Sequence, residues 1–556
     1  MKLIDEPIEV LDLVAFFIDD PADLLSLALS ARLFADIVIP DHIRFRRLRC
    51  KPDVGLFKSL EQRPDIASKL REITICSSLG LANGFKELFI PTPLAGKKLY
   101  RSPAPSIISQ RTLRKSKSAS FRKVLNAVVN PGNQGLPFHG RAVNPDRTSL
   151  SPNPRQPGLL NANDGELLLS SLANVILGMG FLRRFCLHIS TQPLPGFQNL
   201  FETLRRECSA LEELHIFLEI PFGNPPYPLD DIVKPMWGFS NLTALFLEIR
   251  HPVDPTVPSD YAEEMVGMVL RCKELRDLHL CVARYGEGLI RIPRLLRDGC
   301  WDQLRRLSID GLLCLFEDDS NVVENGAVLS AFYRRHPKLE AIEVNSSSTL
   351  FVPGHVDPTS LPNLKDLELK MFAYNKVDEL IPIDVCRNLV CLITLTHEVS
   401  VQLLKQMVHL RIFGGMVDLD DLAGLADALP NIERLHVRSA VHPGWDKTTP
   451  CFRSALLNKY LDPVLRLKKL THLTGLLVYQ TFEFRDFGKK TNAFSRLASS
   501  LSRLECVQVR NPHGYEQTLR FIRDEHERCC GFEWEVDDLS NPTDGWGNFF
   551  RGFARK

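Results

Sequence analysis

A short pattern of apolar residues recurs along most of this chain and limits the folds that the chain can adopt. Residues 211–216 are one copy, Leu-Glu-Glu-Leu-His-Ile, in which the first, fourth and sixth positions are apolar. Copies begin at Leu70, Leu182, Leu211, Leu242, Leu275, Leu304, Leu339, Leu364, Leu389, Met407, Ile432, Leu473 and Leu504. From Leu182 onward, neighbouring copies start 18 to 41 residues apart. A constant local pattern at variable spacing indicates a repeat protein.

Each copy has the alternation expected of a β-strand. Successive side chains of a strand point to opposite sides, so Leu214 and Ile216 face one side while Glu213 and His215 face the other. One such strand cannot bury its apolar side alone, whereas stacked repeats share a core and form a parallel sheet. Helical periodicity predicts return helices at 261–272, 322–333 and 418–429. The expected fold is α/β, a leucine-rich-repeat horseshoe solenoid with parallel strands preceded by a small helical module.

Pattern and composition together predict five parts in the chain. They are a helical module (1–50), a linking helix with a first repeat-like strand (51–90), an insertion (91–160), the solenoid (161–528) and an aromatic tail (529–556). The tail contains Trp534, Trp546, Phe549, Phe550 and Phe553. We expect these aromatic residues to cap the open end of the solenoid, because a terminal repeat needs a cover.

The insertion differs from the rest in composition. Residues 91–160 contain ten prolines, and from Lys97 to Leu160 twelve Lys and Arg residues stand against Asp146 alone. Such a segment cannot bury enough apolar surface to offset its ordering entropy, so we predict disorder. The basic run at 111–123 fits a nuclear-import signal, a kinase site or an electrostatic nucleic-acid contact. Alternatively, the insertion is a solvated linker without a binding role, or a stretch translated from an unspliced part of the gene.

Two amphipathic helices are predicted at the N-terminus. The first follows Pro7 and has apolar residues at helical spacing, at Ile8, Leu11, Val14 and Ile18. The second is predicted to run over 24–34 with Asp23 as its N-cap. Two short helices with this much apolar surface need a partner beyond their own small core.

The same region resembles an F-box. The resemblance lies in Pro7, Glu9, Val10 and Leu11, in the run 23–29 (Asp-Leu-Leu-Ser-Leu-Ala-Leu) and in 32–34 (Arg-Leu-Phe). Residues 39–46 (Ile-Pro-Asp-His-Ile-Arg-Phe-Arg) look like the continuation seen in F-box proteins of mushroom-forming (basidiomycete) fungi that carry C-terminal leucine-rich repeats.

The resemblance implies that the module docks the adaptor subunit of an SCF-type cullin ubiquitin ligase. By analogy Pro7, Ile8, Val10, Leu11, Leu24 and Leu27 would contact the adaptor. The repeats would then present an unknown protein substrate, and the chain would perform no chemistry itself. The alternative function is a stand-alone leucine-rich-repeat interaction scaffold without ligase association.

The polar side of the strands is the expected substrate surface. The residues proposed for it are Glu213, His215, Phe217, Phe246, Glu248, Asp277, His279, Asp310, Glu343, Glu368, Arg434 and Arg438. The early repeats are acidic at these positions and the later ones basic. A partner with one basic and one acidic patch would be oriented by this polarity. Solvated strand faces that carry charge without binding anything are the alternative.

The sequence offers no catalytic constellation. It lacks a Walker phosphate loop, a Gly-x-Ser-x-Gly elbow and a His-Glu-x-x-His helix. His526, Cys529 and Cys530 cluster, but adjacent cysteines make a poor chelate, so we expect neither a metal nor another cofactor. No apolar run reaches the roughly 20 residues that span a bilayer. We expect a cytoplasmic or nuclear protein that contacts neither membrane nor nucleic acid, whose fourteen cysteines remain reduced.

Overall fold

The computed structural model of the chain divides into two compact units. It describes residues 3, 6–18, 21–39, 42, 46–76, 162–190, 196–219, 234–252, 260–285, 290–310, 312–313, 322–346, 357–371, 377, 381–417, 422–439, 461–474, 487–510 and 516–536. The described residues up to 410 belong to the first unit and those from 411 to 536 to the second. The predicted insertion at 91–160 and the aromatic residues at 546–553 lie outside the described residues.

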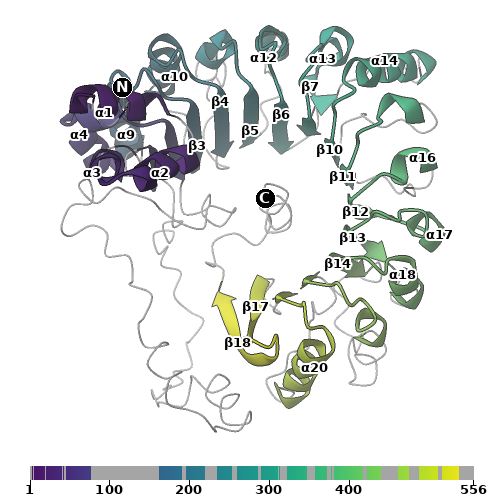
Figure 1. The fold of residues 1–556 in the computed structure, drawn as a ribbon. Helices are drawn as coiled ribbons and strands as arrows, with labels where there is room; N and C mark the ends of the chain where they lie inside the picture. The colour runs from purple at the N-terminus through teal and green to yellow at the C-terminus, as the bar shows by residue number, and fades with distance from the viewer. Residues whose placement is uncertain are drawn as a thin grey trace, which may run out of the picture. The chain divides into compact units, whose positions relative to one another are not determined.

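The first unit is built on a parallel sheet in which strand order follows chain order (Figure 1). Its strands are β1 (Arg47–Cys50), β2 (Glu72–Cys76), β3 (Arg184–Ser190), β4 (Glu213–Glu219), β5 (Ala244–Pro252), β6 (Asp277–Tyr285), β8 (Arg306–Asp310), β10 (Ala341–Ser346), β11 (Asp366–Met371) and β12 (Cys391–Glu398). A separate two-stranded sheet pairs β7 (Ile290–Arg291) with β9 (Leu312–Leu313). The sheet begins with β1, inside the range expected for the helical module, because β1 pairs in parallel with β2.

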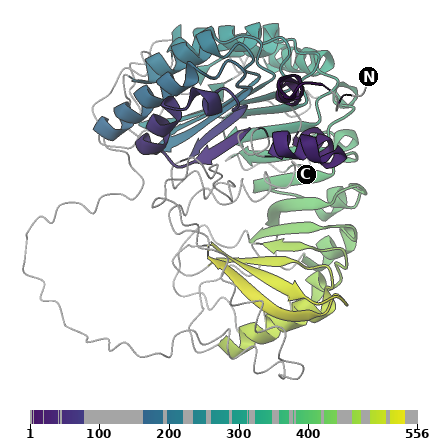
Figure 2. The same ribbon diagram turned by 60° about the vertical axis from the view of Figure 1, so that its left-hand side comes forward.

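Helices on the return paths form an outer layer beside these strands, as Figures 1 and 2 show. They are α4 (Val54–Glu61), α5 (Pro64–Ala67), α9 (Ala162–Ile176), α10 (Gly196–Glu207), η3 (Lys234–Gly238), α12 (Asp260–Arg271), α13 (Pro293–Asp298), α14 (Val322–Arg335), η5 (Pro358–Ser360), α16 (Ile383–Cys386) and α17 (Val401–Leu404). The helices predicted at 261–272 and 322–333 are confirmed as α12 and α14.

The core lies between the sheet and this outer layer. In β4, the apolar positions of the pattern, Leu214 and Ile216, have no exposed surface. Their partners in the next strand, Leu245 and Leu247, are equally buried, and Leu200 of α10 is fully buried on the helix side. One leucine side chain contributes about 1.5–3 kcal/mol when buried, and every repeat adds several. The unit is therefore a leucine-rich-repeat solenoid.

The second unit continues with parallel strands and ends with antiparallel ones. Its elements are β13 (Ile412–Val417), α18 (Leu422–Ala428), β14 (Arg434–Ser439), β15 (His472–Thr474), α20 (Phe487–Ser500), β16 (Cys506–Arg510), β17 (Glu516–Arg523) and β18 (Cys529–Val536). The strands from β13 to β16 pair in parallel, whereas β17 is antiparallel to both β16 and β18. The sequence pattern did not predict this change of direction. The helix predicted at 418–429 is described from Leu422.

Two predicted repeat positions are wrong by three residues. The copies begin at Leu410 and Leu470, not at Met407 and Leu473, because β13 and β15 start two residues after Leu410 and Leu470. Leu410, Phe413, Leu470 and Leu473 are all buried. In both true frames the sixth position is glycine, at residues 415 and 475. A search for apolar residues at that position therefore selects the neighbouring frame.

The N-terminal module contains three helices, α1 (Ile8–Phe17), α2 (Pro21–Ser30) and α3 (Arg32–Val38). The single helix predicted over 24–34 is wrong. Ala31 has an extended backbone, with φ −158° and ψ 150°, which ends α2 and caps α3. Asp23 does not cap a helix start; it lies in the first turn of α2, where its charge is favourable near the helix N-terminus.

Candidate protein-interaction surfaces

The N-terminal helices carry an unusual amount of exposed apolar surface. Eight of the fourteen large exposed apolar side chains among the described residues lie between residues 3 and 39. Val10, Leu13 and Phe17 occupy one side of α1 at helical spacing. On α2, Leu25 and Leu29 lie four residues apart and are 48% and 77% exposed. We define the module apolar surface as Ile8, Val10, Leu13, Phe17, Leu25 and Leu29.

The predicted adaptor residues divide between this surface and the core of the module. Pro7, Ile8 and Val10 are exposed and Leu27 is partly buried. Leu11 packs with Phe34 and Ile37, and Leu24 packs with Ala15, Ala28 and Val38. Both are fully buried, so they support the surface from inside rather than form it. Helical spacing finds an apolar side, but α1 and α2 have two such sides, and spacing alone does not tell which one the module covers.

Two buried arginines hold the end of α1 against the first repeats. Arg46 Nη2 donates hydrogen bonds to the carbonyl oxygens of Ala15 (2.8 Å), Phe16 (2.8 Å) and Ile18 (3.1 Å). Arg71, which precedes β2, donates to the carbonyl oxygen of Phe16 at 3.2 Å. The last carbonyl groups of a helix lack intrahelical partners and carry partial negative charge, so cations there are stabilising. These contacts attach the helical module to the sheet.

Aromatic packing strengthens the same junction. The Phe16 ring meets the Phe181 ring edge-on, with centroids 4.8 Å apart. The guanidinium carbon of Arg71 lies 4.4 Å from the Phe16 centroid and 4.9 Å from the Phe181 centroid, within the range of cation–π attraction. Buried His42 lies 2.7 Å from Asp12 through Nε2. Burial lowers the pKa of His42, although Asp12 opposes that effect. The sequence patterns did not reveal this junction.

On the face of the strands that is turned away from the return helices, parallel pairing aligns the predicted substrate residues into rows. The row through His215 is Thr74, Cys186, His215, Phe246, His279, Ser308, Glu343, Glu368 and Ile393, one residue from each strand from β2 to β12. A second row is Cys76, His188, Phe217, Glu248, Cys281 and Asp310. Neighbours in a row are adjacent in space although 25 to 112 positions separate them in sequence.

Aromatic and imidazole rings stack along these rows. Phe246 and His279 are nearly parallel, with an interplanar angle of 4° and centroids 4.0 Å apart. His215 stacks on Phe246 at 5.8 Å, and His188 stacks on Phe217 at 5.7 Å. We call these five residues the His/Phe ladder. Four members of the ladder are buried, His188, His215, Phe217 and His279, each at most 9% exposed, and Phe246 is half-buried.

Polar contacts extend from the ladder to its neighbours. His279 Nδ1 lies 2.7 Å from Ser308 Oγ, and its Nε2 lies 3.8 Å from Glu248. Burial, reinforced by His215, lowers the pKa of His188 to about 3. Burial also acts to lower the pKa of His215, but Cys186 and then Glu213 outweigh it and raise that pKa. At neutral pH His188 is therefore neutral, whereas the surroundings of His215 favour its protonated form.

The expected acidic character of the early repeats is partly cancelled. Arg184 forms an ion pair with Glu213, and Asp277 lies 3.7 Å from Arg306 on the next strand. Neither arginine was among the predicted surface residues. Farther along, the Cys281 thiol donates to Asp310 at 3.4 Å.

The remaining predicted surface residues lie on other strands. Glu343 and Glu368 are half-buried on β10 and β11. In the second unit Arg434 is half-buried on β14, and the side chain of Arg438 lies outside the described part of the structure. His436 Nδ1 there lies 2.6 Å from Thr474 Oγ1, which repeats the histidine–hydroxyl pairing of His279 and Ser308.

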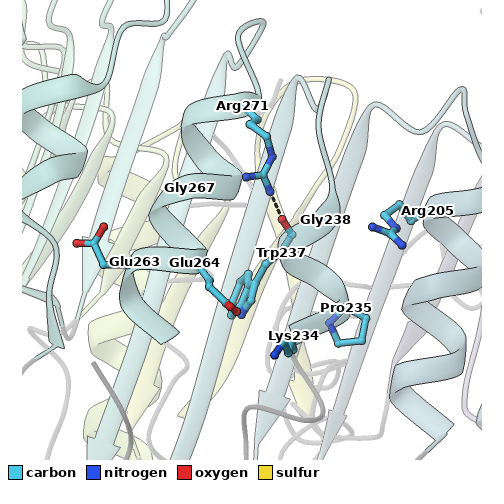
Figure 3. Close-up of a pocket in the computed structure, with 9 residues that line it drawn as sticks. All are labelled: Arg205, Lys234, Pro235, Trp237, Gly238, Glu263, Glu264, Gly267 and Arg271. Atoms are coloured by element: carbon cyan, nitrogen blue, oxygen red, sulfur yellow. Dashed lines mark hydrogen bonds between the residues drawn. The ribbon is translucent and has the colours of Figure 1, made fainter. Parts of the chain in front are cut away.

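A groove opens in the outer helical layer between α10 and α12. The described part of the connection from β4 to β5 contains the five-residue η3, which contacts both α10 and α12. The groove has a volume of about 510 Å³ and is lined by Arg205, Lys234, Pro235, Trp237, Gly238, Glu263, Glu264, Gly267 and Arg271 (Figure 3). In Figure 3 the Glu264 side chain reaches toward Trp237, whereas Glu263 points away, toward Arg294 at 3.1 Å.

A glycine inside α12 forms part of the groove wall. Among the described residues, a Cβ on Gly267 would meet only the Arg271 guanidinium, at an ordinary 3.6 Å, so none of these neighbours requires its absence. Glycine inside a helix costs roughly 0.5–1 kcal/mol relative to alanine. Gly267 therefore leaves open space that core packing does not need.

The described residues show no metal-binding group and no helix suited to a membrane. No three His, Cys, Asp or Glu side chains gather there as a set of metal ligands. None of the helices in the described ranges is long and apolar enough to cross a bilayer.

Comparison with known proteins adds little to the description of these surfaces. No family model and no curated protein matches the sequence. Among solved structures, the chain is similar to one titled "Crystal structure of TLR13-ssRNA13 complex", with 13% identity and a TM-score of 0.27. The match covers 65% of this chain and 54% of that one, so this chain spans about half of that protein's length.

Proposed function

We propose that the N-terminal module docks the adaptor subunit of an SCF-type cullin ubiquitin ligase and that the repeats hold a protein substrate. The concentration of exposed apolar residues on α1 and α2 carries this proposal. Apolar surface of this kind marks a binding site, since exposing it to water is unfavourable. The F-box resemblance of the same residues supports an adaptor as the occupant.

The geometry refines the predicted contact set. We propose that Ile8, Val10, Leu13, Phe17, Leu25 and Leu29 contact the adaptor, with Pro7 at the start of α1 beside them. Leu11 and Leu24 hold the helices in place from the core. The junction made by Arg46 and Arg71 supports a fixed orientation of the module relative to the first repeats.

Binding of the purified adaptor subunit to the full chain tests the proposal. Changing Leu25 and Leu29 together to alanine should weaken adaptor binding at least tenfold without altering thermal stability, because both side chains are exposed. Changing Ile383 and Val408 to alanine is the matched control, since these apolar residues are exposed on the repeats. The control should bind the adaptor as the wild type does.

A stand-alone interaction scaffold is the competing function. It needs the repeats alone and predicts no adaptor binding. If the wild-type chain fails to retain the adaptor at micromolar concentration, the ligase proposal is rejected and the scaffold remains.

A further inference from the structure

We propose that the groove between α10 and α12 binds a short acidic segment of a partner protein. The groove lies in the outer layer of the repeats, away from the module apolar surface, so the proposal is independent of adaptor docking. Its volume, about 510 Å³, is within the range of ligand-binding clefts, about 300–1,000 Å³.

Within the described residues, the helical layer leaves a place for such a segment. The neighbouring repeats supply α10 and α12, each of twelve residues, whereas η3 has five. Trp237 and Gly238 of η3 form the floor of the groove. On the α12 side, Gly267 has no side chain that would project into the groove. A chain segment can therefore approach the floor closely and cover apolar surface.

The charges around the groove select the partner. Arg205 lies across Gly238, Lys234 stands at the start of η3, and Arg271 lines the α12 side. Glu263 is engaged by Arg294, outside the groove, which leaves Glu264 as the acidic side chain turned inward. The lining holds three cations, Arg205, Lys234 and Arg271, against two carboxylates, of which Glu263 is paired with Arg294. This net positive charge attracts acidic side chains and disfavours basic ones. The chain's own insertion, with twelve Lys and Arg residues between 97 and 160, is thus a poor occupant.

Selection from a displayed library of random 15-residue peptides on the full chain tests the proposal. Acidic peptides with a central apolar residue should be enriched, and the Gly267→Leu variant should not enrich them. Leucine fits the helix and places its side chain into open space, so this variant keeps its fold, which circular dichroism checks. Enrichment of basic or uncharged peptides, equal enrichment on Gly267→Leu, or no enrichment would each overturn the proposal.

Reversing the charge of Arg205 distinguishes specific binding in the groove from general electrostatic attraction of the peptide to the protein. Arg205→Glu should lower the affinity for the selected peptide at least tenfold, as measured by fluorescence anisotropy. A peptide with lysine in place of its acidic residues should regain affinity for that variant. Arg503→Glu, a charge reversal at an exposed site outside the groove, should leave the affinity within twofold. Equal losses in both variants would reject a specific site.

A second copy of the chain is the other possible occupant. Dimerisation that Gly267→Leu abolishes in analytical ultracentrifugation would identify that occupant and overturn the proposal.

Discussion

The N-terminal helices and the repeat strands place their apolar residues differently. In the repeats, apolar positions alternate along each strand, and one layer of helices covers the apolar side of the sheet. In α1 and α2, apolar residues occupy two sides of each helix. The three helices α1, α2 and α3 pack on one another and cover only one of these sides. The described residues from 42 to 536 expose six large apolar side chains, while residues 3–39 expose eight. The excess at the N-terminus supports the docking proposed for this module, whereas most apolar side chains of the repeats are buried in the core.

Polar side chains also differ from what their position predicts, because several of them are buried in the repeats. The repeats bury polar side chains such as His215, Glu248, His279 and Ser308 on the face of the strands that is turned away from the helices. Parallel neighbours stack and hydrogen-bond there, so a position that points away from the core is not necessarily exposed. A strand face therefore has to be judged from its rows, not from single residues.

The largest effect is expected from a substitution that unfolds repeats and leaves the N-terminal helices α1–α3 intact. Leu367 of β11 has no exposed surface. Leu367→Asp buries an unpaired carboxylate and should cost more than about 4 kcal/mol. Hydrogen exchange should accelerate in β10, β11 and β12, while α1–α3 stay protected, because each repeat is stabilised mainly by its neighbours. Lys365→Asp places the same carboxylate at an exposed site and should leave exchange unchanged.

A matched pair in α2 tests the difference between the two sides of a helix. Leu24→Ala removes a fully buried side chain and should lower the opening free energy of α2 by about 3 kcal/mol. Leu29→Ala removes one that is 77% exposed and should change it by less than about 0.5 kcal/mol. Hydrogen exchange of the α2 amides measures both. Equal effects would contradict the division into a covered and an open side.

Acid should weaken the repeats through His336. Its Nδ1 donates to the Phe332 carbonyl oxygen at 2.7 Å, and its Nε2 accepts from the Trp301 amide at 3.0 Å. Burial lowers the pKa of His336 to about 4 from 6.5. Between these two pKa values, His336 is protonated in the unfolded chain but remains neutral in the folded chain. The free energy of unfolding therefore falls as pH decreases from 6.5 to about 4, by roughly 3 kcal/mol at most.

Thermal unfolding between pH 7 and pH 4.5 measures this dependence. His336→Gln should show a flatter dependence than the wild type, since glutamine does not titrate. An unchanged dependence would exclude His336 as the source.

The smallest expected effect concerns the junction between the two regions. Arg46→Met removes three hydrogen bonds to the end of α1 and should lower its opening free energy by about 2 kcal/mol. Hydrogen exchange in α1 measures the change. Arg32→Met, at an exposed site on α3, is the control and should have little effect. Unaltered exchange in the Arg46 variant would show that Arg71 and the aromatic packing hold α1 without Arg46.

The apolar pattern predicted most of the strands correctly, and its errors have physical causes. Every copy from Leu182 to Leu389 precedes a strand. The frame was wrong at Leu410 and Leu470, where glycine replaces the last apolar residue. The antiparallel strands β17 and β18 carry no copy of the pattern, because their pairing follows hairpin register rather than repeat stacking. The break at Ala31 was missed because the apolar spacing continues across it.

The sequence alone determined that the chain is a repeat protein with parallel strands and an N-terminal module rich in apolar residues, because alternation and helical spacing are local properties of the chain. Which apolar residues remain exposed depended on tertiary structure, since Leu11 and Leu13 are equally apolar but only Leu11 is covered by α3. The His/Phe ladder, the arginine junction at Phe16 and the groove beside Gly267 also arose only in three dimensions. Each joins residues far apart in the sequence, and their distances are set by strand register and helix packing, which no local pattern specifies.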